Sequence, residues 1–197
     1  MFSYPPATSL TRPLPLPAEY SEVTDHACLI THMPARSITL LQIHTADVDR
    51  VAPLAGRAFD EPVAGFATYR GPRAYALAPT EWLLIDYPRD RMRRSLEEFG
   101  DLPVRLTDVS AAFSCMQIEG SAARAVLATD IGASWMASSA RPGNYVRTRL
   151  GQVEVVLQCT GDCSFELHVD RSVAAHLEQW LTAQFEMHFP SGGSQFQ

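Results

Sequence analysis

The chain contains no lysine, and all 16 of its basic side chains are arginines. Without lysine there is no Schiff base with a carbonyl substrate, no phosphate-loop lysine and no ammonium general base. The chain also lacks any long basic run, and its formal net charge is -6. Because nucleic-acid-binding proteins contact phosphates through clustered positive charge, we predict no nucleic-acid partner.

Segments that would direct the chain to a membrane are missing as well. A membrane-spanning helix needs about 20 consecutive apolar residues, and every apolar run here is much shorter. A secretory signal combines a basic stretch with a following apolar run, and no such pair occurs near Met1. We therefore expect a cytoplasmic protein that has no membrane partner.

The cysteines do not have the paired CxxC spacing of a zinc site. There are four of them, Cys28, Cys115, Cys159 and Cys163, and we interpret them as reduced thiols. Cys159 and Cys163 flank a predicted turn between two strands. Besides two ordinary hairpin cysteines, this spacing leaves open a disulfide or, with His168, a metal site.

Motifs of catalytic and nucleotide-binding sites are also missing. The sequence has no GxGxxG or GxxxxGK loop, no GxSxG elbow and no HxxxH pair on a predicted helix. Its six histidines are scattered, and His44 and His168 fall in predicted strands, where we interpret them as sheet residues rather than bases. We therefore predict no catalytic, cofactor-binding or metal-binding residue in this chain.

What the sequence does contain is a succession of strands and helices that occurs twice. The first copy has strands at Ser37–His44, Arg73–Leu77 and Trp82–Tyr87 and helices at Asp47–Phe59 and Arg89–Phe99. The second has strands at Phe113–Glu119, Tyr145–Leu150, Val153–Gln158 and Phe165–Val169 and helices at Ser121–Ile131 and Arg171–Phe185. The turns Ala78–Glu81 and Thr160–Cys163 correspond in the two copies. This order predicts an α+β fold with two similar β-α-β-β-α halves on mainly antiparallel sheet.

The helix ends and faces are marked by individual residues. Asp47 and Ser121 are predicted to cap their helices, and Gly100 to end the helix before it. Apolar residues at helical spacing are predicted to face the core. They are Val48, Val51, Leu54, Ala55, Ala58, Met92, Leu96, Phe99, Ala122, Ala125, Val126, Ala128, Val173, Leu177, Trp180, Leu181 and Phe185. The cluster of Arg91, Arg93 and Arg94 is interpreted as a solvated helix face or, alternatively, as a clamp for an anion.

These patterns divide the chain into three segments. Residues 1–36 form a proline-rich arm and lead-in, residues 37–186 a globular unit, and residues 187–197 a flexible tail. The globular unit consists of two related halves, residues 37–103 and 104–186. The first 20 residues contain five prolines and several apolar side chains, which favours an extended arm on a neighbouring subunit over a disordered tail.

One constellation in the second half resembles the folate-dependent aminomethyltransferase family. Thr107-Asp-Val-Ser110, the helix after Gly120 and Thr129-Asp-Ile131 match the opening of that family's pattern. Gly151-Gln-Val-Glu-Val155 stands where the family has an acidic pair, and Asp170 stands where it has an amide. Valine cannot accept a proton, so the resemblance implies lost transferase chemistry. The alternative reading is a stand-alone folate-binding protein or related enzyme, with Asp108, Asp130 and Glu154 in a cleft.

A second resemblance covers most of the chain after Ser37. The segment Ala76-Leu-Ala-Pro-Thr-Glu-Trp-Leu-Leu-Ile85, the Thr107–Ser110 turn and the helix from Arg171 to Leu181 resemble the gamma subunit of heterotetrameric sarcosine oxidase. This resemblance implies a non-catalytic subunit that braces the large subunit of a flavin-dependent oxidase of sarcosine or another N-methyl amine. It implies alpha, beta and delta subunits as partners, which would hold FAD, FMN, NAD, tetrahydrofolate and zinc, and no cofactor in this chain.

Overall fold

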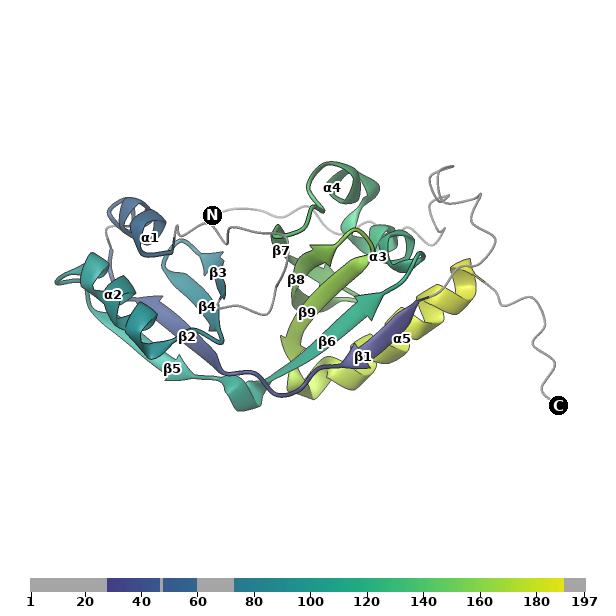
Figure 1. Cartoon of the computed structure of the whole chain (residues 1–197), viewed down its shortest axis with the longest axis horizontal. Helices are drawn as coiled ribbons and strands as arrows, with labels where there is room; N and C mark the ends of the chain where they lie inside the picture. The colour runs from purple at the N-terminus through teal and green to yellow at the C-terminus, as the bar shows by residue number, and fades with distance from the viewer. Residues whose placement is uncertain (1–27, 47, 60–72, 190–197) are drawn as a thin grey trace.

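The computed structural model describes residues 28–46, 48–59 and 73–189 of the chain. In this part of the chain two antiparallel sheets carry their helices on opposite sides (Figure 1). The strands are β1 (Leu29–His32), β2 (Ile38–Ile43), β3 (Arg73–Ala78), β4 (Glu81–Ile85), β5 (Val104–Asp108), β6 (Phe113–Glu119), β7 (Tyr145–Leu150), β8 (Val153–Gly161) and β9 (Ser164–Asp170). The helices are α1 (Val51–Phe59), α2 (Arg89–Phe99), α3 (Ala123–Ile131), α4 (Ala133–Ser138) and α5 (Ala174–His188). The predicted α+β class is confirmed.

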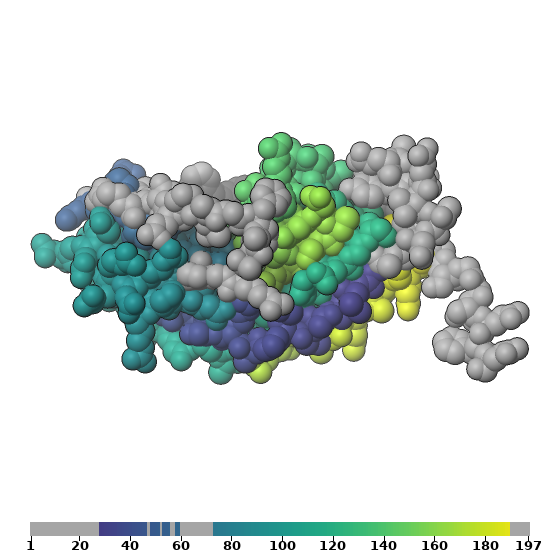
Figure 2. All heavy atoms as spheres, in the orientation of Figure 1, coloured from purple at the N-terminus to yellow at the C-terminus, as the bar shows by residue number. Residues whose placement is uncertain are grey.

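Each sheet contains one strand from beyond its own half. The first has the order β3-β4-β2-β5 and the second the order β1-β6-β9-β8-β7. Strand β1 precedes the first half in sequence but pairs with β6, and β5 follows residue 103 but pairs with β2. The predicted boundary between residues 103 and 104 therefore separates β5 from the sheet that it completes, and the lead-in of residues 1–36 contains a strand of the second sheet. Figure 2 shows β1 and β2 as one band along the lower edge of both halves.

The sheet topology supports the internal duplication. Leaving out β7, the orders β3-β4-β2-β5 and β8-β9-β6-β1 correspond strand for strand. The predicted turns join β3 to β4 and β8 to β9, and the pairing shifts register just before each turn, between Ala76 and Ala78 and between Cys159 and Gly161. The two hairpins therefore share an irregularity at corresponding positions, as two copies of one unit would.

The core has three parts, which follow from the alternation of side chains along the strands. One lies between the first sheet and helices α1 and α2 and includes Leu41, Trp82 and Phe99. A larger one lies between the second sheet and helices α3, α4 and α5. The third joins the inner faces of the two sheets and contains Tyr75 and Val156. The molecule is therefore layered as helices, sheet, sheet and helices.

Most predicted elements are confirmed to within a few residues. Helix α2 spans the predicted Arg89–Phe99, and Gly100 follows it with a φ of 57°. Ser121 was predicted to cap α3, but the N-cap position is Ala122 and has no side-chain cap. The predicted helix Asp47–Phe59 begins only at Val51, and Val48 is exposed instead of facing the core. Strands β1 and β5 and helix α4 were not predicted as elements.

Some predictions lie outside the described residues. These are residues 1–27 of the predicted arm and lead-in, the capping role of Asp47 and residues 190–197 of the tail. The tail residues Met187 and His188 belong to α5, so the tail was predicted to begin too early. In the described part of the chain, no helix has the length and apolarity that a membrane crossing requires.

Candidate functional site

Polar side chains gather between the two sheets, where an apolar layer would be expected. In β9, Phe165, Leu167 and Val169 face the helices, so Glu166 and His168 point to the opposite, inner face of the sheet. Cys115 of β6 lies opposite His168 in the strand register. We call the group formed by Arg36, Arg73, Tyr75, Cys115, Gln158, Glu166 and His168 the inter-sheet cluster.

Glu166 is the centre of this cluster. Its Oε1 lies 2.9 Å from Nη1 of Arg73, and its Oε2 lies 3.4 Å from Nη2 of Arg36. The thiol of Cys115 donates to Oε1 over 3.4 Å. Nε2 of His168 lies 3.2 Å from the same oxygen, although its direction does not make a hydrogen bond. The buried carboxylate is thus surrounded by cationic and donor groups from both halves of the chain.

Two further contacts complete the network. Arg36 donates to Asp86 over 2.7 Å, so its guanidinium bridges two carboxylates. The Tyr75 hydroxyl donates to Oε1 of Gln158 over 2.6 Å and accepts from Arg73 over 3.2 Å. With two arginines and two carboxylates, the formal charges of this network cancel.

The environment fixes the protonation of each acid in the cluster. Burial alone would raise the pKa of Glu166, but contact with His168 and the charge of Arg73 hold this pKa at about 2. Burial, together with the charge of Glu166, raises the pKa of the Cys115 thiol to about 12. Burial also raises the pKa of Tyr75 well above its usual range. At neutral pH the carboxylate is therefore ionised, and the thiol and phenol are protonated.

Three members of the cluster have the spacing of metal ligands. The ligand atoms of Cys115, Glu166 and His168 lie within 4.8 Å of one another, the one such group in the described part of the chain. A divalent cation there would lie beside the charges of Arg36 and Arg73 and would have to displace the proton of a thiol whose pKa is about 12. The three ligand atoms are close enough to share a cation, but their electrostatic environment opposes one.

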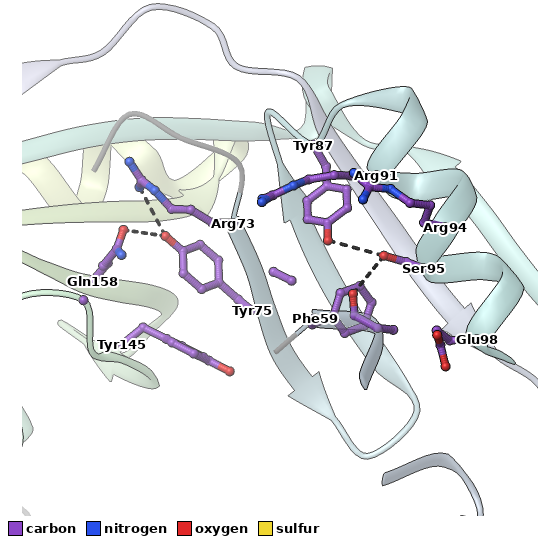
Figure 3. A pocket seen from close by; sticks show the side chains of 13 residues that line it. Phe59, Arg73, Tyr75, Tyr87, Arg91, Arg94, Ser95, Glu98, Tyr145 and Gln158 are labelled. Carbon is purple, nitrogen blue, oxygen red and sulfur yellow. Dashed lines mark hydrogen bonds between the residues drawn. The ribbon is translucent and has the colours of Figure 1, made fainter. Parts of the chain in front are cut away.

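Two pockets border the cluster. The larger, of about 320 Å³, lies between β3, α2 and the strands β7 and β8, and Figure 3 shows Arg73 and Tyr75 at one side of it. The smaller, of about 210 Å³, is lined by His168 together with Glu154, Val155 and Asp170. Of these, Glu154 is the acid that remains from the aminomethyltransferase pattern, and Val155 and Asp170 are positions at which the sequence departs from it.

The carboxylates of the alternative folate reading have separate partners in the structure. Asp108 accepts from the backbone and the hydroxyl of Ser110, which lowers the pKa of this carboxyl group. Asp130 accepts from the backbone N–H of Gly151 over 2.7 Å. Glu154 pairs with Arg147 over 3.1 Å and is largely exposed. Each acid therefore stabilises a local turn or strand pair, and neither Asp108 nor Asp130 lines the pocket of Glu154.

The cysteine hairpin separates its two sulfurs. Cys159 is buried in the helix-facing core, where its thiol donates to the carbonyl of Gly161, and Cys163 is exposed. All four cysteines are free thiols in the structure. His168, the third member of the metal alternative, points to the other face of the sheet, toward Cys115.

The inter-sheet cluster was not predicted from the sequence, although the alternation of residues in β9 indicates a polar face of this strand. In Phe165-Glu-Leu-His-Val169, polar residues alternate with apolar ones, which is typical of a strand with one solvent-facing side. Here the polar side faces a second sheet and is buried. Partners as distant in sequence as Arg36 and Arg73 cannot be read from local pattern.

The protein is thus an α+β protein with an internal duplication and with buried ion pairs between its two sheets. A protein-family model described as "sarcosine oxidase, gamma subunit family" matches residues 58–186. The chain belongs to this family, which confirms the resemblance seen in the sequence. A search of curated proteins finds no match.

Two solved structures are similar to the chain. A chain of the heterotetrameric sarcosine oxidase from Corynebacterium sp. U-96, solved with pyrrole 2-carboxylate, matches 85% of this chain and 88% of its own length at 21% identity and a TM-score of 0.63. The glycine cleavage aminomethyltransferase T of Bartonella henselae matches 83% of this chain and 47% of its own at 12% identity and a TM-score of 0.45.

Proposed function

We propose that the chain is a non-catalytic, gamma-type subunit of a heterotetrameric, flavin-dependent oxidase of sarcosine or a similar N-methyl amine. In this role it braces the large subunit in the cytoplasm. The observation that carries the proposal is the family match over residues 58–186. The similarity in fold to a chain of a heterotetrameric sarcosine oxidase agrees with it.

The chemistry of the interior supports a non-catalytic role. A general base needs a pKa near the working pH, and a nucleophile needs an accessible ionised form. Glu166 has a pKa of about 2 and is held by two arginines, and the pKa of Cys115 is about 12. The inter-sheet cluster is therefore suited to holding the sheets together and poorly suited to moving protons.

The proposal assigns the redox chemistry to the partners. Alpha, beta and delta subunits would hold FAD, FMN, NAD, tetrahydrofolate and zinc, as the family resemblance implies. This chain would contribute surface and rigidity to the assembly.

Co-expression tests the proposal. The alpha, beta and delta subunits are produced with and without this chain, and assembly is measured by size-exclusion chromatography and activity by sarcosine-dependent oxygen consumption. We expect the complete set to assemble and oxidise sarcosine, and omission of this chain to reduce recovery of the assembled complex. The chain alone is expected to be colourless and inactive.

Two results would contradict the proposal in different ways. Full assembly and activity without this chain would show that it does not brace the complex. A flavin-bearing preparation of this chain alone that oxidises sarcosine would show that it is catalytic.

A further inference from the structure

The two sheets have four edge strands, and three of these edges are protected against a further strand. Strands β3 and β5 border the first sheet, and β1 and β7 border the second (Figure 1). An exposed edge carries backbone N–H and C=O groups that can pair with another chain, so proteins usually block it with charges, proline, bulges or covering side chains. Among the edges in the described part of the chain, only that of β1 lacks these devices.

The edge of β3 is covered by side chains from β7. The Tyr145 hydroxyl accepts from the backbone N–H of Ala76 over 2.8 Å, and Arg147 donates to the carbonyl of Leu77 over 3.0 Å. The pairing of β3 with β4 also shifts register beside these two residues. A further strand could reach this edge only by displacing the two side chains.

The edges of β5 and β7 carry exposed charged side chains, and the edge of β1 does not. Arg105 and Asp108 lie in β5, and Arg147 and Arg149 lie in β7. Strand β1, Leu-Ile-Thr-His, contains no proline, arginine, aspartate or glutamate, and its register with β6 is unbroken. Its Leu29 is 61% exposed, more than any other large hydrophobic side chain in the described part of the chain. The edge of β1 therefore combines open backbone groups with an exposed apolar side chain.

The register with β6 identifies the backbone groups of β1 that point outward. The N–H of Met33 donates over 2.9 Å to the carbonyl of Cys115, the residue opposite it when the register is continued. In an antiparallel pair, hydrogen-bonded and non-hydrogen-bonded residue pairs alternate. Thr31 therefore also directs its backbone groups to β6, whereas Ile30 and His32 direct theirs to the open edge.

We propose that the edge of β1 binds an extended strand of a partner subunit, which pairs with the backbone of Ile30 and His32. This inference rests on the proposed function, in which the chain is one of several different subunits. An extended strand supplies the backbone donors and acceptors that this edge can pair with, and an apolar side chain on it would pack against Leu29. The second sheet, which ends at β1, would thereby gain one strand.

A proline at position 32 tests this pairing. Proline has no N–H, and because the N–H of His32 points away from β6, His32→Pro removes the outward donor and keeps the ladder with β6. His32→Ala is the matched control, since it removes only the side chain, which pairs with Glu178 over 3.0 Å. Each full-length variant is titrated into co-expressed alpha, beta and delta subunits, and assembly is followed by size-exclusion chromatography. We expect His32→Pro to raise the concentration for half-maximal assembly by about tenfold and His32→Ala to leave it nearly unchanged.

Hydrogen exchange of the unaltered chain is a second measurement, which does not depend on the folding of a variant. In the chain alone, the amide of His32 should exchange much faster than that of Thr31, which NMR can resolve. In the assembled complex, mass spectrometry of fragments that contain β1 should show exchange slowed by about tenfold or more.

Several results would overturn this inference. Equal assembly of His32→Pro and His32→Ala, both folded by circular dichroism, is one, and unchanged exchange of β1 in the complex is another. Protection of the His32 amide in the chain alone would show that this chain covers its own edge. A dimer of the chain alone that His32→Pro dissociates would assign the edge to a second copy instead. Failure of the unaltered chain to assemble with the other subunits would contradict the proposed function itself, and this inference with it.

Discussion

Replacement of Glu166 by glutamine removes the charge at the centre of the inter-sheet cluster and keeps the shape of the side chain. The residue is 4% exposed, and its carboxylate lies 2.9 Å from Arg73. Removal of one partner of a buried ion pair costs about 3–5 kcal/mol, because the remaining charge is left uncompensated. The depressed pKa gives a second measure, since the difference between 4.5 and about 2 corresponds to about 3 kcal/mol. We therefore expect Glu166→Gln to lower the free energy of unfolding by about 3 kcal/mol at neutral pH.

The loss should depend on pH in a defined direction. The pKa of Glu166 is lower in the folded than in the unfolded chain, so its contribution is present above pH 4.5 and is lost as the pH falls toward about 2. At about pH 3 less than half of the contribution, about 1 kcal/mol, remains. The difference in the free energy of unfolding between wild type and Glu166→Gln should therefore be smaller at about pH 3 than at neutral pH.

Urea denaturation followed by circular dichroism at about pH 7 and about pH 3 measures both effects. Glu154→Gln is the matched control, because Glu154 pairs with Arg147 over a similar 3.1 Å but its side chain is 64% exposed. An exposed pair contributes about 0–1 kcal/mol, so this control should differ little from wild type. Equal losses in the two variants, or a Glu166→Gln loss that does not change with pH, would refute the electrostatic account of the cluster.

The remaining predictions concern the backbone and the thiols. Gly151 and Gly100 have nearly the same φ, 56° and 57°, but a Cβ at Gly151 would lie 2.7 Å from the ring of Trp180, whereas nothing lies within 4 Å of one at Gly100. Gly100 combines its positive φ with a ψ of −123°, so in thermal unfolding Gly100→Ala should cost about 1–3 kcal/mol of backbone strain. Gly151→Ala should cost about 1–3 kcal/mol more because of the contact with Trp180, and a smaller cost than that of Gly100→Ala would contradict the clash. Iodoacetamide at neutral pH should modify the exposed Cys163 and spare the folded chain's Cys115, whose pKa is about 12; peptide mass spectrometry that finds Cys115 alkylated as fast as Cys163 would disprove its burial as a neutral thiol.

The elements that could be predicted from the sequence are those specified by local pattern. Helix α2 has its apolar stripe, charged outer face and terminal glycine within one short segment, and its bounds were predicted correctly. Strand β1 was missed because its four residues are mostly exposed and form an edge that only β6 defines. Strand β5 was not predicted, and its residues were counted with the second half, because its pairing with β2 spans more than sixty residues of sequence. Local pattern thus identifies elements but not their partners.

In the candidate site, too, the sequence pattern identified single residues but not the partners that they contact. The acids Asp108 and Asp130 were noticed because they stand in a family pattern, and the structure shows them stabilising local backbone. The groups that do meet, such as Arg73 and Glu166, lie 93 positions apart and carry no shared motif. A buried polar layer between two sheets is visible only when both sheets are in place.

The exchange of β1 and β5 gives the inter-sheet cluster its structural role. Strand β1, from the lead-in before the first half, is an edge strand of the second sheet, and β5, from the second half, is an edge strand of the first. The connections β1–β2 and β5–β6 therefore both cross between the sheets (Figure 1). Apolar side chains alone, such as Ile85 and Val156, would tolerate small shifts of one sheet over the other. The contacts of Glu166 with Arg36 and Arg73 do not, since a shift would leave buried charges unpaired. The crossing strands thus fix which sheets meet, and the charged cluster fixes the position of one sheet on the other.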